Sequence, residues 1–368
     1  MDISIFIPVY RESNQLEGML KELSTQAVSK EIFVTIDEPT PEFSQELKQM
    51  QSENVRFVIN QERKGKANVL NEAVKQASGN VLLFLDSDVQ VCSDPDFLKK
   101  IIMETGRTDV LDIKKEVSKD KSFLSRMAYY EYFTFNVSAW LSSRYMNKCP
   151  CVNGAAFAMK RETFEKVGGF RAVIAEDIDL ATRVFMADGN FSYTSQVQVK
   201  NVVYSDWSRW FRQRRRWSIG QAMWTVDWYR DLCKKFVKKP QVFLPGLFFL
   251  YPSIAIFVVS ALMPSNWMYS GLLVFSLFLS VKFNIMLPVF LVSLATANIL
   301  KVLTIMLSGF AFTAVTFYML SRKIGFRQMK LHELFVYYFF YSNVYIALQV
   351  LGFLQVLAGK KTGPGWKT

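Results

Sequence analysis

Short apolar runs alternate with amphipathic stretches along the first hundred residues. The runs are nearly continuous, as in strands buried on both faces of a sheet; they are Ile3–Ile7, Ile32–Ile36, Val55–Ile59 and Val81–Leu85. Between them, helical spacing of apolar residues predicts helices over Glu12–Gln26, Pro41–Gln51 and Lys66–Ala77. Strands that alternate with helices predict an α/β fold with a parallel sheet that helices cover on both faces. Ligands of such sheets bind beyond the carboxyl ends of the strands.

The middle of the chain adds longer helices. The aromatic-rich stretch Phe123–Tyr145 predicts one helix or two beneath the ligand site. Val152–Met159 predicts a strand, while Glu162–Val167 and Glu176–Ala187 predict helices, the second opened by acidic residues that suit its dipole. The basic, tryptophan-rich residues after Trp207 predict helices that lie in a membrane interface.

Apolar residues then dominate from about Val242 to Ala358 and predict a helical transmembrane domain. Two spans are expected at Val242–Met263 and Leu334–Ala358, with a longer apolar region, Met268–Leu320, between them. That region is too long for one span and contains two lysines, so it predicts two more. With four spans the basic run 322–330 would face outside, against the positive-inside tendency. Either that segment is interfacial or the number of spans differs by one.

The formal net charge of +12 raises the question of nucleic acid. Much of the excess lies in basic runs that flank apolar segments, which are 212–216, 234–239, 322–330 and 360–367. Such runs are typical of membrane orientation and of contacts with anionic lipid headgroups. No base-stacking platform accompanies them, so no nucleic acid partner is expected.

Four cysteines are too few and too irregular for a disulfide framework or a structural zinc site. The single histidine, His332, is expected to pack near a span rather than to bind a ligand. The first residues, MDISIFIPVY, lack a basic region followed by an apolar core, so no signal peptide is expected. The α/β domain is therefore predicted to stay in the cytoplasm.

Acidic residues follow the predicted strands. Asp37 follows the second strand, and Asp86 and Asp88 follow the fourth, so one sheet edge gathers carboxylates. Neither GxGxxG nor GxxxxGK[ST] is present, which argues against a dehydrogenase and an NTPase motor. Two carboxylates one residue apart can hold a hard cation that also binds diphosphate oxygens. A DxD motif alone is more often a solvated loop.

Further motifs raise the specificity of this pattern. They are Ile7–Tyr10 with Glu12, Asp37, Lys64–Asn68 with Asn71, Asp86–Asp88, Asn153–Gly154 with Arg161, Gly168–Phe170, Glu176–Asp179 and Gln213–Trp217. The motifs occur in the same order as in family 2 glycosyltransferases of GT-A fold, and the chain resembles members of that family such as cellulose, chitin and hyaluronan synthases. The resemblance covers residues 3–217. It departs from most polymer synthases because no spans precede the catalytic residues.

The resemblance implies a role for each site. Donor binding would fall to Pro8, Tyr10, Glu12, Asp37, Lys66 and Asp86. Asp88, with Asp86, would ligate Mg²⁺ or Mn²⁺. Asp177 would be the general base of an inverting displacement, with Glu176 beside it.

The residues themselves support the base. Three acids in the four residues that open this helix repel one another and raise at least one pKa, which helps a carboxylate to accept a proton. A negatively charged helix start without catalytic meaning is the alternative.

Gln213, Arg216 and Trp217 form a QxxRW motif, which the resemblance associates with processive enzymes. The arginine suits diphosphate charge, and the tryptophan suits stacking on an acceptor sugar. A basic interfacial helix is a compatible interpretation.

Together these features predict three domains: a cytoplasmic glycosyltransferase domain at 1–205, interfacial helices with the QxxRW motif at 206–241, and a transmembrane domain with a short cytoplasmic tail at 242–368. We expect an integral protein of the cell membrane that moves a sugar from a nucleotide-sugar, with UDP implied by the resemblance, to a growing β-linked glycan. A single transfer to a membrane lipid, such as a polyprenyl phosphate, ceramide or diacylglycerol, is the alternative. A membrane partner or an oligomer could complete a channel, and a non-catalytic scaffold is the remaining hypothesis.

Overall fold

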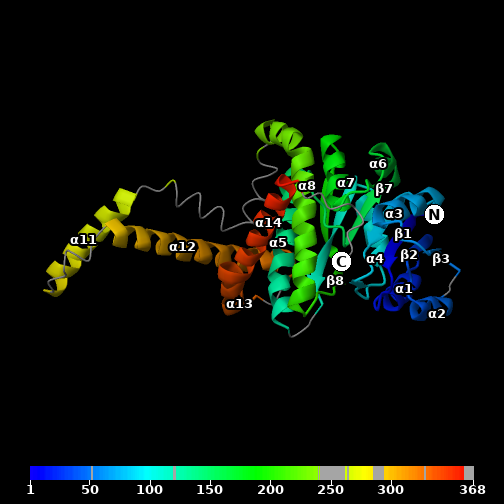
Figure 1. Ribbon diagram of the computed structural model, residues 1–368, viewed down its shortest axis with the longest axis horizontal. Helices are drawn as coiled ribbons and strands as arrows, with labels where there is room; N and C mark the ends of the chain where they lie inside the picture. The colour runs from blue at the N-terminus through cyan, green and yellow to red at the C-terminus, as the bar shows by residue number, and fades with distance from the viewer. Residues whose placement is uncertain are drawn as a thin grey trace. The chain divides into compact units, whose positions relative to one another are not determined.

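A computed structural model describes residues 1–50, 53–118, 122–238, 265–284, 294–326 and 329–359, together with residues 240 and 262. The chain divides into two compact units. The first consists of Met1–Gly246 and Val344–Thr368, and the second of Leu247–Asn343. Figure 1 labels the elements of both units.

The described strands of the first unit form one sheet in the order β3-β2-β1-β4-β7-β6-β8-β5. Their bounds are β1 Ile3–Tyr10, β2 Lys30–Asp37, β3 Val55–Asn60, β4 Val81–Leu85, β5 Val89–Val91, β6 Val110–Val117, β7 Ala156–Lys160 and β8 Phe191–Asn201. The four strands predicted within the first hundred residues are confirmed. β5, β6 and β8 had no counterpart in the prediction.

The sheet is mixed, so the prediction of a parallel sheet was wrong beyond its first half. β1 pairs in parallel with β2 and β4, and β2 pairs in parallel with β3. β7 runs antiparallel to both β4 and β6, and β5 runs antiparallel to β8. Apolar periodicity reports burial but not strand direction, which is why the sequence pattern missed the reversal.

Helices cover the sheet, and their bounds are α1 Leu16–Ser24, α2 Pro41–Gln49, α3 Lys66–Gln76, α4 Phe97–Thr105, α5 Phe123–Met146, α6 Arg161–Lys166, α7 Glu176–Met186 and α8 Trp207–Lys238. Two of these helices, α2 and α5, begin with a residue whose side chain caps the first turn. The Thr40 side chain accepts a hydrogen bond from the Phe43 N–H at 3.2 Å, with Pro41 as the first helical residue. Ser122 caps α5 in the same way through the Ser125 N–H at 3.2 Å.

Alternate side chains of β1 enter two apolar cores on opposite faces of the sheet. Ile3, Ile5 and Ile7 pack in the core that contains residues of α1, α2 and α4, whereas Phe6 packs with residues of α3, α6 and α7. In Figure 1, α1 and α2 lie on one side of β1 and β2, and α3 lies on the other. This three-layer arrangement leaves the carboxyl ends of the strands as the place for polar chemistry.

A group of phenylalanines fills the core beneath α3 and α7. Phe84 is 2% exposed and lies at its centre. The Phe84 ring centroid lies 5.2 Å from that of Phe6, 5.0 Å from that of Phe157 and 5.1 Å from that of Phe170. Stacked and edge-on aromatic pairs of this kind stabilise a core beyond their area alone. The packing of these rings therefore holds in place the strands that bear the site.

The predicted interfacial helices form one continuous helix, α8, and not several. Arg214 on α8 donates from Nη2 to Glu131 Oε2 on α5 at 2.7 Å, and both side chains are at most 2% exposed. Gln349 of α14 (Ser342–Leu357) donates to the Gln221 side chain at 2.9 Å. α8 is thus anchored through polar contacts to α5 on one side and to α14 on another.

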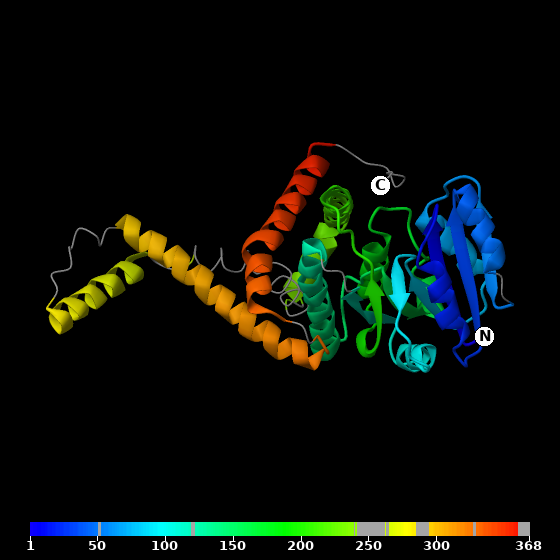
Figure 2. The same ribbon diagram turned by 90° about the horizontal axis from the view of Figure 1, so that it is seen from below.

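The second unit contains helices, and the bounds of its described elements are α11 Ser265–Phe283, α12 Leu294–Lys323, α13 Leu331–Val336 and the π-helical turn η3 Tyr337–Tyr341. Figure 2 shows α12 as one long helix. Residues of α12 contact residues of α11 and of α13.

Two described segments are long and apolar enough to cross a membrane: Asn298–Lys323 and Leu331–Leu357. The middle apolar region, in which two spans were predicted, contains α11 and α12, of which α12 includes one of these segments. Four spans are not confirmed, because in α11 the apolar segment is shorter, Leu273–Phe283. The span expected at Val242–Met263 lies outside the described residues apart from residue 262.

Phe84→Ala should lower the free energy of unfolding of the first unit by about 3–5 kcal/mol, because the cavity would open among well-packed rings. Chemical unfolding of the purified protein, followed by tryptophan fluorescence, measures the change. Ile59→Ala is the control, since Ile59 is 46% exposed. An equal loss in both variants would contradict the central role of the phenylalanine cluster.

Candidate active site

The ends of β1 and β2 bring Tyr10 and Asp37 side by side, because these residues are register partners. Asp37 is buried, and its carboxylate accepts from Asn60 Nδ2 at 3.0 Å and from the Gly65 N–H at 2.8 Å. The Tyr10 hydroxyl donates to Glu38 Oε2 at 3.0 Å. Hydrogen bonds thus hold both predicted donor-binding residues before any ligand arrives.

Arg63 is a site residue that the sequence pattern did not single out. Its guanidinium lies over the Tyr10 ring, 4.3 Å from the ring centroid. Arg63 stands in the loop between β3 and α3, where no apolar pattern or motif marks it.

Two further residues were predicted to bind the nucleotide-sugar donor. Pro8 lies within β1, and Glu12 is exposed just beyond it. In the described part of the chain, no hydrogen bond or ion pair of the Glu12 side chain links it to Tyr10 or Asp37.

Lys66, the first residue of α3, joins two of the predicted motifs. Its ammonium group lies 2.7 Å from Asp86 Oδ1 and 3.0 Å from Glu176 Oε1. Burial alone would lower the pKa of Lys66, but the charges of Asp86, Glu176 and Asp177 raise it above its ordinary value. The lysine therefore stays charged and brings the DxD loop and the start of α7 together.

Asp86 and Asp88 follow β4 directly. The surrounding protein and the charge of Asp86 raise the pKa of Asp88 to about 7, although Lys66 and Arg216 oppose the shift. A divalent cation would relieve this repulsion, so the pair fits Mg²⁺ or Mn²⁺. Among the described residues, no group of three or more His, Cys, Asp or Glu side chains is placed to hold a metal ion. Two carboxylates suit a cation that keeps water and phosphate oxygens as its other ligands.

Asp177 lies at the first turn of α7, where backbone groups orient its carboxylate. Oδ2 accepts from the Gly154 N–H at 2.7 Å, and Oδ1 accepts from the Ile178 N–H at 2.8 Å. Burial and the charge of Glu176 raise the pKa of Asp177 to about 6, against the opposing effects of Lys66 and these hydrogen bonds. A carboxylate with a raised pKa at the edge of a polar site is suited to accept a proton.

The QxxRW motif lies on α8, and its three residues have different surroundings. The charge of Arg216 is close enough to act on Asp88. Gln213 accepts from Arg214 Nη1 at 2.7 Å. The Trp217 ring has the Arg214 guanidinium over it, 4.1 Å from the ring centroid. The electrostatic link between Arg216 and Asp88 connects the motif to the carboxylates of the DxD loop.

Residues 4–168 match the family model for Glycosyl transferase family 2. Over these residues, the chain is similar to family 2 glycosyltransferases. Probable glycosyltransferase YdaM of Bacillus subtilis (strain 168) is 24% identical over 368 residues, which cover 95% of this chain and 81% of that protein. A poly-beta-1,6-N-acetyl-D-glucosamine synthase of Staphylococcus epidermidis is 25% identical over 224 residues, or 59% of this chain. The match spans about half of that synthase, 54% of its length.

Among solved structures, the mannosyltransferase PcManGT from Pyrobaculum calidifontis, in complex with GDP-Man and Mn²⁺, has a similar fold. The TM-score is 0.51 at 19% sequence identity, with 82% of this chain and 86% of that chain covered. The fold of the glycosyltransferase domain is therefore GT-A-like, and a helical region follows it.

Some motif residues of the glycosyltransferase domain serve its architecture. Asn71 of α3 donates to the Phe170 carbonyl at 2.8 Å and accepts from the Phe170 N–H at 2.9 Å. Arg161 donates from Nε to the Gly79 carbonyl at 2.7 Å. These contacts tie loops that are distant in sequence, so a motif position does not by itself mark contact with substrate.

Gly154→Ala should lower kcat by about 100-fold, because a small displacement of a catalytic group is costly. A Cβ at this position would lie 2.5 Å from Asp177 Oδ2 and 2.9 Å from Asp177 Cβ. Steady-state kinetics measures the loss, and calorimetric titration with nucleotide should give an unchanged affinity. A variant with full kcat would show that the Asp177 carboxylate is not fixed by its contact with Gly154.

The raised pKa of Asp177 predicts an acid limb in the pH profile of transfer. An acid whose pKa is about 6 is protonated below that pH and cannot accept a proton, so kcat/KM, which reports the pKa values of the free enzyme, should fall about tenfold for each pH unit below 6. The measurement is kcat/KM from pH 5 to 8 at saturating metal. A flat profile over this range would exclude Asp177 as the titrating base.

Proposed function

We propose that this chain is an inverting, metal-dependent glycosyltransferase that moves a sugar from a UDP-sugar to a growing β-linked glycan at the membrane. The observation that carries the proposal is the position of Lys66 between Asp86 and Glu176. It joins a cation-binding pair of carboxylates to the start of the helix that bears Asp177. An inverting transfer needs both, one for the leaving diphosphate and one for the attacking hydroxyl.

The donor would bind beyond the ends of β1 and β2. For a nucleobase and its ribose, Pro8 offers a fixed backbone, Tyr10 an aromatic ring and Asp37 a carboxylate. PcManGT binds GDP-Man, which supports a nucleoside diphosphate sugar as the donor class. Uridine is the base implied by the resemblance to polymer synthases, and Glu12 would approach the nucleotide from the exposed side.

Asp88 and Asp86 would hold Mg²⁺ or Mn²⁺, which when bound neutralises charge that develops on the departing diphosphate. The presence of Mn²⁺ in PcManGT supports a divalent ion in this fold. Lys66 and Arg216 add positive charge beside the same carboxylates.

Asp177 would accept the proton of the acceptor hydroxyl as the new glycosidic bond forms. The bond between the anomeric carbon and the diphosphate breaks on the opposite side, so the anomeric configuration inverts. Glu176, which is paired with Lys66, would keep that lysine beside Asp86 during the step. Trp217 and Gln213 would contact the acceptor, and the Trp217 ring suits a sugar face.

We further propose the three domains expected from the sequence, at 1–205, 206–241 and 242–368. The two segments long and apolar enough to cross a membrane, in α12 and from α13 to α14, support a membrane location. The poly-beta-1,6-N-acetyl-D-glucosamine synthase among the relatives supports a polymer as the product. The catalytic domain would face the cytoplasm, where nucleotide-sugars are made.

Asp177→Asn should lower transfer by at least about 1,000-fold and leave nucleotide affinity unchanged, because the amide cannot accept the proton but keeps the shape. Asp88→Asn, as a matched variant, should instead raise the metal concentration needed for half-maximal activity. Radiolabel transfer and calorimetric titration with nucleotide separate the two effects. Loss of nucleotide binding in Asp177→Asn would contradict its role as a base.

The product distinguishes the proposed polymerase from a single transfer to lipid. The protein in lipid nanodiscs, given labelled UDP- or GDP-sugars and Mg²⁺ or Mn²⁺, should place label in long chains that a glycosidase digests. Label only in the organic phase would mean a lipid acceptor. Absence of transfer from every donor would overturn the enzymatic proposal.

A further inference from the structure

Two tryptophans of α8 donate hydrogen bonds to α7, the helix that begins with the proposed base. Trp224 Nε1 donates to Thr182 Oγ1 at 2.9 Å, and Trp228 Nε1 donates to Asp179 Oδ1 at 3.0 Å. The donors lie one turn apart on α8. Because an indole has one donor and no acceptor, each bond fixes both the rotation and the height of α8 against α7.

Asp179 is the central acceptor of this contact. It is buried, and its other carboxylate oxygen accepts from Arg183 Nε at 2.9 Å. Arg183 also donates a hydrogen bond from Nη2 to the Gly169 carbonyl at 2.6 Å. Asp179 lies two residues after Asp177, so a shift of its carboxylate would move the turn that presents the base.

The backbone of α8 also lies close to the start of α7. A Cβ at Gly220 would lie 3.0 Å from Ile174 Cγ2 and 3.4 Å from Ala175 Cβ. Ile174 and Ala175 directly precede the acidic pair that opens α7. The glycine therefore allows α8 to approach the base from the N-terminal side of α7.

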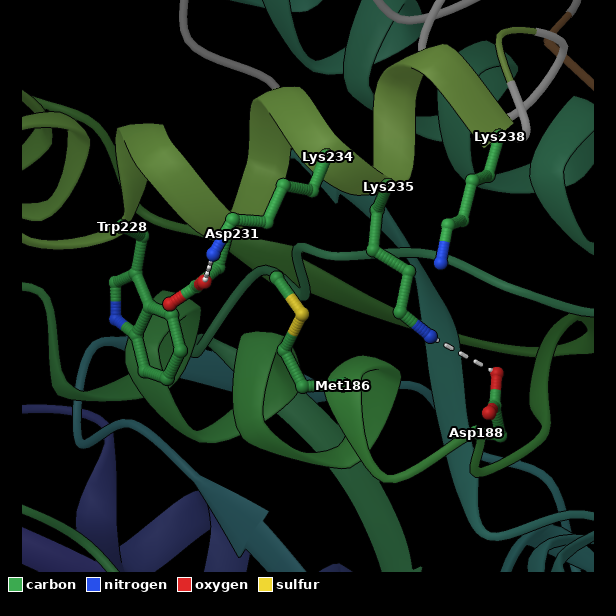
Figure 3. A pocket seen from close by; sticks show the side chains of 7 residues that line it. All are labelled: Met186, Asp188, Trp228, Asp231, Lys234, Lys235 and Lys238. Atoms are coloured by element: carbon green, nitrogen blue, oxygen red, sulfur yellow. Dashed lines mark hydrogen bonds and ion pairs between the residues drawn. The ribbon is translucent and has the colours of Figure 1, made fainter.

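Trp228 is not enclosed by packing on all sides. Its ring lines a pocket of about 510 Å³ together with Met186 and the ends of two lysine–aspartate pairs (Figure 3). One of these pairs, Lys235 Nζ to Asp188 Oδ1 at 3.1 Å, is a further link from α8 to the residues just after α7. Part of the ring faces open space, and its orientation is held by the indole hydrogen bond and by the Arg171 guanidinium, which lies 5.9 Å from the ring centroid.

We propose that Trp224 and Trp228 are positioning residues, whose indole N–H groups keep the helix of the base, α7, in register with the helix of the QxxRW motif, α8. The inference rests on the proposed function, because it takes Asp177 as the base. A base must lie within hydrogen-bond reach of the hydroxyl it deprotonates. The acceptor is held by α8 and the base by α7, so the relative position of these helices controls the chemical step.

Trp224→Phe and Trp228→Phe remove the donors but keep aromatic rings. Each should lower kcat about tenfold, and the double variant about 100-fold, because displacements of about 1 Å carry losses of that order. The KM for the donor and the nucleotide affinity should not change, since the residues proposed to hold the nucleobase and ribose, Tyr10 and Asp37, lie at the ends of β1 and β2. Trp207→Phe, at the exposed start of the same helix, is the matched control and should keep the wild-type kcat.

Gly220→Ala tests the same contact without removing a hydrogen bond. Alanine favours a helix over glycine, so α8 itself should not weaken, while the added methyl group would push it from Ile174 and Ala175. We expect a lower kcat at unchanged donor KM. Gly18→Ala on α1 is the control, because a Cβ there would meet no heavy atom within 4 Å.

Partial unfolding would lower the concentration of active sites, and with it the apparent kcat, at unchanged donor KM. The melting temperature and the number of nucleotide sites found by calorimetric titration therefore separate positioning from stability. The proposal is overturned if the tryptophan and Gly220 variants keep wild-type kcat. It is also overturned if their losses follow the melting temperature or appear equally in Trp207→Phe. Asp177→Asn is measured in parallel. If that variant keeps the wild-type kcat, Asp177 is not the base and this part of the proposed function fails, whereas an inactive Asp177→Asn with fully active tryptophan variants overturns the positioning role alone.

Discussion

The ammonium group of Lys66 is the charge on which the arrangement of the site depends. It lies among carboxylates from two loops that would repel each other, and its contacts with Asp86 and Glu176 connect the end of β4 to the start of α7. Those loops are about ninety residues apart in the sequence. The phenylalanine core and the polar contacts between helices hold the frame, but this one cation makes the convergence of the acids electrostatically tolerable.

A buried strand could be predicted from the sequence only where its own residues are apolar. Ile3–Ile7 is apolar throughout, so its strand was evident. β6 is concealed because it contains Lys114 and Lys115, which are buried as ion pairs with Glu116 and Asp112. Pairs of this kind offset part of the cost of burying charge and leave no apolar pattern in the sequence. The direction of β7 is decided by tertiary pairing and has no local signal.

The same division applies to the site. Asp37 and Asp86 could be placed at the same edge of the sheet from the sequence alone, because the carboxyl ends of parallel strands share an edge. The setting of Asp177 could not, since its carboxylate is oriented by Gly154 across a reversal of the chain. Arg63 over the Tyr10 ring had no signal either, because a cation–π contact joins residues without any fixed spacing in sequence.

The contact between Arg214 and Trp217 limits how an acceptor can approach. The guanidinium covers one face of the indole, and a buried ion pair with Glu131 keeps that arginine in place. A sugar that stacks on Trp217 can therefore use only the opposite face. With Trp217 as the proposed acceptor contact, α8 would then admit an acceptor sugar from one side of this ring only.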